Sequence, residues 1–294
     1  MAVGNLGGIY HVRGDYSKAL DCYTQKLHCA LEIGDRLEMC ISIGNLGHIY
    51  EDQGEFARAT SCYLRSLELA LELGDRMGVG MALLGLGTVA IAEGELVHSE
   101  ALVGQAEVVF AAMEATYELA DGRVLRAELA ARSGANGLAR TLLLEAGELA
   151  EAAGNDEAAG RCALLALQLD HERGALSDDM AVALLRERLE PLTNDERRAE
   201  LLLALVRIDG TQAAARAAAA GLYRALHMAT AKLAYRRAYL ELMGVALPSP
   251  PPLPAPPAHV TRRLPGRETL IERADSFVHA LQAEPLVERA TGAG

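Results

Sequence analysis

The segment GNLGGIY at residues 4–10 returns as GNLGHIY at residues 44–50, forty positions later. Further identities between the two units are Gly14/Gly54, Ala19/Ala59, Cys22/Cys62, Tyr23/Tyr63, Leu27/Leu67 and Ala30/Ala70, and both units close on Gly-Asp-Arg. Glycines continue the series at positions 94, 134 and 174, although the residues around them match the first two units less closely. Self-similarity at a fixed period of this length is the sequence sign of stacked repeats, in which each unit buries its apolar face against the next.

Each unit holds two helix-ending positions about twenty residues apart, because Gly or Asn there can adopt the left-handed backbone. Between them the apolar residues follow helical spacing, as Ala19, Tyr23, Leu27 and Ala30 do in the first unit. Every unit is therefore predicted to be an antiparallel helix pair. The expected pairs lie near 2–33, 36–73, 76–113, 116–153 and 156–190, with a shortened sixth pair after residue 195.

Composition supports this prediction. Of the 294 residues 51% are hydrophobic but only 4% are aromatic, none is Trp, and Ala and Leu dominate. Such a sequence favours helices over pleated sheets, so we expect an all-α protein. Recurrent small residues, such as Gly7, Gly47 and Gly87, would let helix axes approach closely, since Gly inside a helix otherwise costs about 1 kcal/mol.

Charge and cysteine content indicate which partners and which cellular compartment to expect. The formal net charge of −12 would repel a phosphate backbone, so nucleic acid is not an expected partner. We found no apolar run of membrane-spanning length and no secretory signal pattern, so a cytoplasmic protein without a membrane partner is expected. The five cysteines form no CxxC pair and are expected to be reduced thiols within the helix packing.

The repeat resembles the tetratricopeptide repeat. The residues that match its pattern are Val3, Leu6-Gly7, Tyr10, Gly14, Ala19 and Tyr23 in the first unit, and Ile43, Leu46-Gly47, Tyr50, Gly54, Ala59 and Tyr63 in the second. Pro191 falls in frame for the family's late proline in the fifth unit. The 40-residue form resembles both the Leu-Gly-Asn-repeat adaptors of spindle orientation and the helical arrays of bacterial signalling kinases, cyclases and ATPases. The resemblance implies an elongated, right-handed superhelical solenoid whose units contact only their neighbours.

Three regions are expected along the chain. Residues 1–244 would form the solenoid, with repeats near 1–35, 36–75, 76–115, 116–155, 156–194 and 195–244. Residues 245–266 would form a linker, because seven prolines between 248 and 257 favour extended polyproline II. Residues 267–294 would form a short amphipathic helix and a tail. The chain begins inside a repeat motif, which suggests either a fragment of a larger protein or a genuine short start.

The resemblance also implies a concave groove, lined by the first helix of each pair, that binds a protein or peptide. Asn5 and Asn45 match the position at which peptide-binding members place an asparagine, whose amide can donate to and accept from a ligand backbone. On the same faces we expect His11 in the first unit, His48, Glu51 and Asp52 in the second, and Met81, Leu84 and Thr88 in the third. The alternative is that Asn45 only belongs to the repeat consensus. The third unit has Gly85 at this position and the fourth has Leu125.

Other motifs predict no chemistry. The run Gly85–Ala90 copies a dinucleotide-binding fingerprint, but it lies inside a predicted helix and follows no strand. Asp170, His171 and Glu172 are adjacent on a predicted helix and cannot converge on one metal ion. The arginines at 132, 140, 161, 173, 186 and 188 are interpreted as surface charge. We therefore predict no catalytic residues, no cofactor and no metal.

The tail from Leu270 to Leu281 carries apolar residues at the spacing of one helix face. An isolated helix of this length is marginal, so we expect residues 267–282 to fold only against a partner or, in cis, against the solenoid's own groove; disorder is the alternative.

Two functions are consistent with these features. The first is a non-catalytic interaction scaffold that holds a peptide or a partner helix. The second is the sensory or regulatory segment of a larger bacterial signalling protein.

Overall fold

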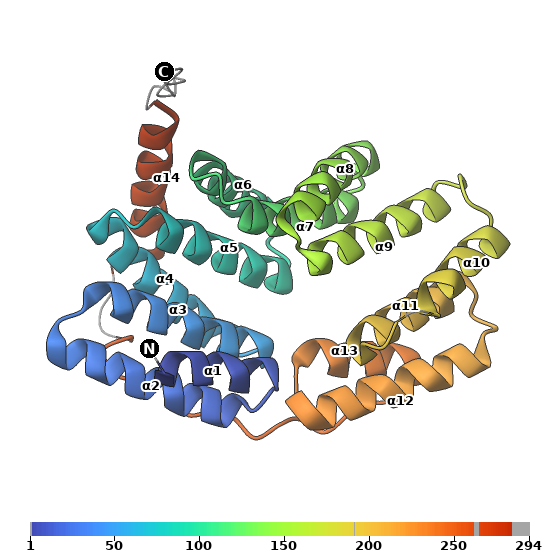
Figure 1. Cartoon of the computed structure of the whole chain (residues 1–294), viewed down its shortest axis with the longest axis horizontal. Helices are drawn as coiled ribbons and strands as arrows, with labels where there is room; N and C mark the ends of the chain where they lie inside the picture. Colours follow the sequence, from blue (N-terminus) through green and yellow to red (C-terminus); the bar gives the residue numbers. More distant parts are fainter. Residues whose placement is uncertain (1, 191, 262–264, 284–294) are drawn as a thin grey trace, which may run out of the picture.

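A computed structural model of the protein describes residues 2–190, 192–261 and 265–283, and within these ranges it contains fourteen helices and no strand. Twelve of the helices form consecutive pairs: α1 (Ala2–Val12) with α2 (Tyr16–Ile33), α3 (Arg36–Asp52) with α4 (Phe56–Leu73), α5 (Arg76–Glu93) with α6 (Leu96–Ala112), α7 (Thr116–Arg132) with α8 (Asn136–Ala153), α9 (Asp156–Glu172) with α10 (Asp178–Leu189), and α11 (Asp195–Ile208) with α12 (Ala213–Thr230). They are followed by α13 (Leu233–Met243) and α14 (Arg267–Ala283). The predicted all-α solenoid of helix pairs is confirmed (Figure 1). Pro191 and the tail beyond α14 lie outside the described residues.

The Gly-Asp-Arg sequence between units is a helix junction. Gly34 ends α2 in the left-handed conformation, with φ of +74°, and its N–H lies against the carbonyls of the last turn. Asp35 then caps α3, because its side chain accepts a hydrogen bond from the backbone N–H of Glu38 at 3.0 Å. Gly74 ends α4 in the same left-handed conformation, with φ of +67°.

Glycine allows three helices to meet around one aromatic ring. Tyr63 of α4 is 1% exposed, and its ring lies between Gly47 of α3 and Gly85 of α5. A Cβ atom at Gly47 would lie 2.7 Å from the Tyr63 ring, and one at Gly85 would lie 2.6 Å from it. Gly7 has the same relation to Tyr23 in the first pair, at 3.0 Å. These glycines are therefore required by packing.

The solenoid closes on itself, so the expected elongated shape with contacts between neighbouring units alone is wrong. The turn between α12 and α13 lies against the turns of the first two pairs (Figure 1). Gln53 Nε2 donates to the carbonyl of Ala231 at 3.1 Å, and a Cβ atom at Gly14 would come within 2.1 Å of Thr230. The curvature adds up over six pairs and brings the two ends together. The prediction considered only contacts between neighbouring units and therefore did not include this closure.

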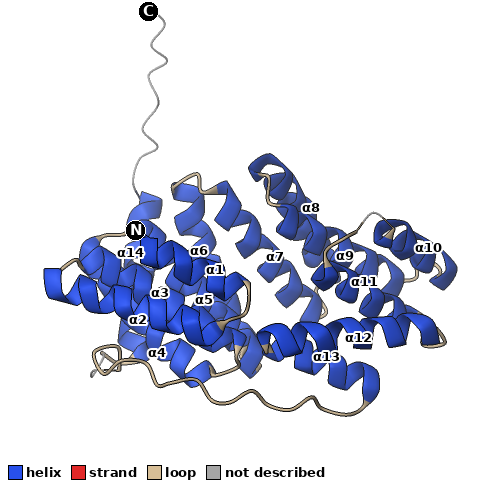
Figure 2. Ribbon diagram, turned by 60° about the horizontal axis from the view of Figure 1, so that its bottom comes forward, coloured by secondary structure: helices blue, strands red, loops and turns tan. Residues whose placement is uncertain are grey.

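The described segment after α13 and helix α14 lie on the outside of the solenoid. The segment after α13 runs in extended form along the outer face toward α2 and α4 (Figure 2). Helix α14 then contacts α4 and α6, which are second helices of their pairs. Its apolar face belongs to the same core as those helices, through Leu270, Ala274, Val278 and Leu281. A location of this helix in the groove is therefore wrong, because the outer surface supplies the apolar contact.

Helix α5 is apolar enough for a membrane span by length and composition, contrary to the expectation from the sequence. Residues 77–92 carry no charge, and half of the helix is buried. In the structure α5 packs against α4 and α6 and also contacts α3 and α7. Its hydropathy is accounted for by its place in the solenoid core.

Replacing Gly47 tests the packing around Tyr63. We expect Gly47→Ala to lower the free energy of unfolding by about 1–3 kcal/mol, because overpacking exceeds the gain in helix propensity. Gly104→Ala is the matched control, since Gly104 lies within α6 and no atom lies within 4 Å of the position that an alanine methyl group would take there. The control should gain about 0.5–1 kcal/mol. Urea unfolding of both variants measures the difference, and equal gains would contradict the packing account.

Candidate peptide-binding groove

The first helices of the pairs form the inner row of the solenoid. Consecutive members of this row contact one another directly, α3 with α5, α5 with α7 and α7 with α9. In Figure 1, α7, α9 and α11 lie nearer the centre than α8, α10 and α12. The inner row is therefore the concave side, as the repeat pattern predicts.

The inner face has a hollow between α3 and α5 with a volume of about 320 Å³. Three of the predicted site residues line it: Asn45, His48 and Met81. Its other walls are mainly apolar, with Leu37, Cys40, Ile41, Met77 and Ala82, and Ser66 and Asp75 add two polar side chains. Leu37 and Ile41 are 48% and 44% exposed. An accessible apolar surface beside an amide is suited to binding a peptide side chain and backbone together.

Tyr63 forms the floor of this hollow and connects two of the predicted residues. Its hydroxyl donates to Glu51 Oε2 at 2.5 Å and lies 2.8 Å from His48 Nδ1. The His48 ring meets the Tyr63 ring edge-on, with 5.3 Å between centroids. The repeat consensus explains why a tyrosine stands here but gives no sign of this contact. The role of Tyr63 in the groove follows from Gly47 and Gly85, which leave room for its ring to reach the inner row, where the buried hydroxyl contacts His48 and Glu51.

His11 and Asp52 form a second polar group, close to the point where the solenoid closes. Asp52 Oδ2 accepts hydrogen bonds from His11 Nε2 at 3.0 Å and from the Tyr16 hydroxyl at 2.9 Å. The charge of Lys232, from the other end of the solenoid, also acts on Asp52. These contacts connect the first two pairs, so His11 and Asp52 have a structural role whether or not they touch a ligand.

Enclosure within the ring changes the proton affinities of the groove residues. Burial, reinforced by the neighbouring charge of Asp52, raises the pKa of Glu51 to about 7, although the Tyr63 hydrogen bond opposes the shift. Burial and the charge of His11 lower the pKa of His48 to about 4. The His48 side chain keeps 37% of its exposure, but it faces an interior surrounded by protein, where an ion is poorly hydrated. For Asp52 burial would raise the pKa, yet the hydrogen bond from His11 and the charge of Lys232 lower it overall.

The remaining predicted residues lie outside the hollow. Asn5 borders a separate shallow depression on α1 with Gly8, Ile9 and Arg13. Leu84 packs partly buried against the core. Thr88 donates to the carbonyl of Leu84 at 3.1 Å within its own helix. The structure thus brings together Asn45, His48, Glu51 and Met81, and leaves Asn5, Leu84 and Thr88 apart from them.

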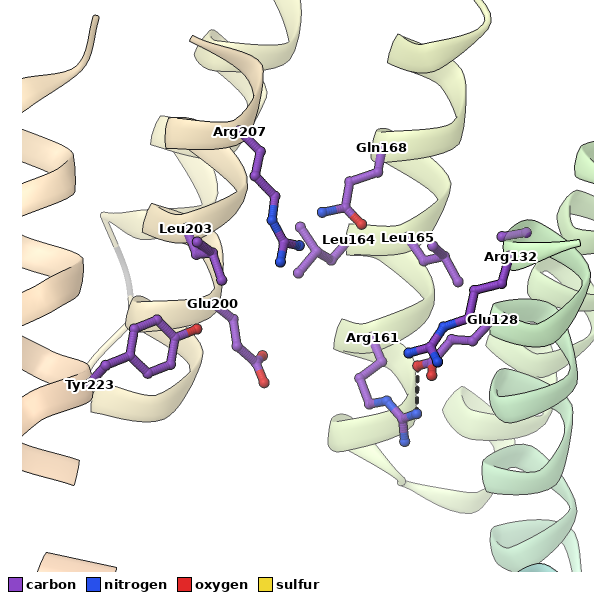
Figure 3. Close-up of a pocket in the computed structure, with 11 residues that line it drawn as sticks. Glu128, Arg132, Arg161, Leu164, Leu165, Gln168, Glu200, Leu203, Arg207 and Tyr223 are labelled. Carbon is purple, nitrogen blue, oxygen red and sulfur yellow. Dashed lines mark hydrogen bonds and ion pairs between the residues drawn. The ribbon is translucent and has the colours of Figure 1, made fainter. Parts of the chain in front are cut away.

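A second hollow, of about 360 Å³, lies on the inner face of the C-terminal half (Figure 3). Arg161 of α9 donates to Glu128 of α7 at 2.6 Å, and Arg132, Glu200 and Arg207 also line the space. Arg161 is half-buried and paired with Glu128, so its interpretation as surface charge is wrong, whereas Arg132 is exposed, as expected. Charged residues from α7, α9 and α11 converge because the inner row curves. Their spacing along the sequence does not indicate that they converge.

The other sequence motifs have structural partners. The run Gly85–Ala90 lies in the middle of α5, as expected. Asp170 accepts from Arg140 and Arg173, whereas His171 lies 2.8 Å from Asp178. Over the part of the chain that the structure describes, no group of three His, Cys, Asp or Glu side chains is arranged to hold a metal ion.

The fold and the inner face define a helical-repeat solenoid with a concave surface. Comparison with protein families gives the type of repeat: the tetratricopeptide repeat family matches residues 2–37 and 42–77. The match falls on the first two pairs, and the later pairs continue the same helical architecture. No curated protein matches the chain. Repeats of this family generally mediate protein–protein interaction.

The raised pKa of Glu51 predicts how the free energy of unfolding depends on pH. Its ordinary pKa is 4.5, so between pH 4.5 and 7 the folded chain binds more protons at this site than the unfolded chain. Stability from this group therefore falls as pH rises through that window, by up to about 3 kcal/mol. Glu51→Gln keeps an acceptor for Tyr63 and lacks the titration, so its stability relative to wild type should increase from pH 5 to pH 8.

Urea unfolding at pH 5, 6.5 and 8 measures this difference. Glu93→Gln, at an exposed position near the end of α5, is the matched control and should show no such trend. A constant difference between Glu51→Gln and wild type across the three pH values would contradict the assignment.

Proposed function

We propose that the protein is a non-catalytic interaction scaffold that binds a peptide segment of a partner protein in the hollow between α3 and α5. The observation that supports this most directly is the position of Asn45. Its side chain borders an accessible apolar hollow, and within the described part of the chain its amide has no protein hydrogen-bond partner. An amide held at an apolar surface can pair with a ligand backbone as donor and acceptor.

The chemistry of the hollow favours an extended peptide over a helix. Backbone groups of a bound helix are already satisfied internally, whereas an extended peptide presents free N–H and C=O groups to Asn45. The volume of about 320 Å³ is at the lower end for a ligand pocket and suits an apolar side chain of the peptide. Met77 and Met81 are flexible, so the wall can adapt to the side chain that enters.

The same proposal covers partners and location. A net charge of −12 disfavours nucleic acid, and α5, a helix apolar and long enough to cross a membrane, is occupied by packing within the solenoid. We propose a cytoplasmic protein that requires neither cofactor nor membrane for binding, with partner recognition as its activity. Repeats of this family are typically non-catalytic, which supports this interpretation.

Asn45→Ala tests the proposal. Peptides would be selected from a random library displayed on phage, and their affinity for purified protein measured by fluorescence polarisation. We expect Asn45→Ala to weaken binding by about 0.5–1.5 kcal/mol, roughly 2- to 13-fold, which is the net value of a neutral hydrogen bond. Its melting temperature should stay close to that of wild type, because the amide makes no internal bond.

Gln25→Ala, an exposed amide on the outer helix α2, is the control and should leave affinity unchanged. If affinity is unaffected while melting falls, Asn45 is a structural consensus residue. If no peptide is enriched on the wild-type protein, the groove is not a peptide site.

A further inference from the structure

The two ends of the solenoid meet through few groups. The contact consists of the turn between α12 and α13 against the turns of the first two pairs, with Gln53 bonded to Ala231 and Leu233 against Gly54. A neutral hydrogen bond contributes only about 0.5–1.5 kcal/mol, and turn residues bury little apolar surface. The contact is close, but it is small compared with the packing between neighbouring pairs.

A second connection runs across the same junction on the outer side. It is the segment 245–261, which we name the strap. At its start the strap is held by the last helices: His227 Nε2 donates to the carbonyl of Pro248 at 3.0 Å, and Arg236 donates to Ser249 Oγ at 2.9 Å. A few residues later it is held by the second pair. Arg58 donates to the carbonyl of Leu253 at 2.7 Å, and the Tyr50 hydroxyl donates to that of Pro254 at 2.8 Å.

The residues between these two attachments are Pro250, Pro251 and Pro252. Proline fixes φ and favours polyproline II, which is already extended at about 3.1 Å per residue. The four steps from Ser249 to Leu253 therefore span about 12 Å and cannot stretch much further. A segment of this kind acts as a rod of fixed length between the last helices and the second pair.

The far end of the strap is anchored more firmly. Val260 is fully buried, and α14 packs its apolar face against α4 and α6. Asp275 of α14 accepts from Gln105 of α6 at 3.0 Å. Four buried apolar side chains contribute far more than the turn contacts, since burying one contributes about 1.5–3 kcal/mol. The strap thus connects a small junction to a large hydrophobic anchor.

The seam between the fifth and sixth pairs, next to the last pair that forms the junction, is loosely packed. Two hollows, of about 360 and 650 Å³, adjoin the seam between α9 and α11, and Arg161, Leu164 and Glu200 line both. A seam with empty space on both sides resists bending less than a close-packed one. If the junction were released, the solenoid would open about this seam.

We propose that the strap holds the two ends of the solenoid together and thereby limits the opening of the groove. It acts as a brace on the outer face, because the strap and α14 both lie outside the groove. A partner that displaces the strap or α14 would widen the ring and ease entry of a groove ligand. The consequence for ligand entry rests on the function proposed above, whereas the mechanical role of the strap does not.

The test slackens the rod in the full-length chain. Eight Gly and Ser residues are inserted between Pro251 and Pro252, which leaves both sets of attachments and α14 in place. Spin labels at Gln25→Cys and Arg237→Cys, with Cys22→Ser and Cys29→Ser, report the distance between α2 and α13 by pulsed electron resonance. The loosened segment would have a root-mean-square span of about 19 Å in place of about 12 Å. We expect a narrow distance distribution in the parent chain and a broader, longer one after insertion.

The matched control carries the same insertion between Ala258 and His259, beyond the attachments to Arg58 and Tyr50. Its distance should equal that of the parent chain. Tyr50→Phe combined with Arg58→Ala, which removes the two bonds to strap carbonyls, should reproduce the broad distribution without any insertion. An unchanged distance in the rod insertion, or equal broadening in the control, overturns the proposal.

Ligand entry is measured separately. The association rate of a phage-selected peptide should rise in the rod insertion and remain at the parent value in the control. An absence of peptide binding in every chain would refute the proposed function while the label distances still decide the role of the strap. Equal association rates, combined with a widened ring, would overturn the link between the strap and the groove.

Discussion

The structure depends on one close approach, the packing of the Tyr63 ring between Gly47 and Gly85. It joins α3, α4 and α5, and it is possible only because neither glycine carries a side chain toward the ring. The same contact turns the Tyr63 hydroxyl toward the inner row, where it bonds to His48 and Glu51. One aromatic side chain thus sets both the spacing of the helices and the floor of the groove.

The two halves of the inner face differ in chemistry. The hollow between α3 and α5 is mainly apolar, with the Asn45 amide at its edge. The hollow between α7, α9 and α11 is lined by arginines and glutamates, several of them already paired, such as Arg161 with Glu128. Charges that satisfy one another leave little for a ligand, whereas an apolar wall gains by being covered. This contrast favours the N-terminal hollow as the binding surface.

Because the solenoid closes, α14 and the strap connect its two ends. Helix α14 alone would be marginal in water, and it becomes part of the core only by packing on α4 and α6. That packing holds the strap across the junction between the first and last pairs. The groove lies on α3 and α5 and α14 lies on α4 and α6, so the two surfaces are on opposite sides of the solenoid wall. A change at one surface can therefore act on the other by altering how far the two ends of the solenoid separate.

The all-α class, the helix pairs and their junctions could be predicted from the sequence, because glycine position and apolar spacing act over a few residues of the chain. The sequence also placed Asn45, His48 and Met81 on one surface, since the repeat frame fixes which helix face each occupies. Four features could not be predicted in this way: the contribution of Tyr63, the convergence of Arg132 and Arg161 on one hollow, the closed ring and the outer position of α14. These features depend on small rotations that add up from pair to pair and on contacts between residues up to two hundred positions apart, such as Tyr50 with Pro254. No local pattern in the sequence indicates the total rotation over six pairs or these long-range contacts.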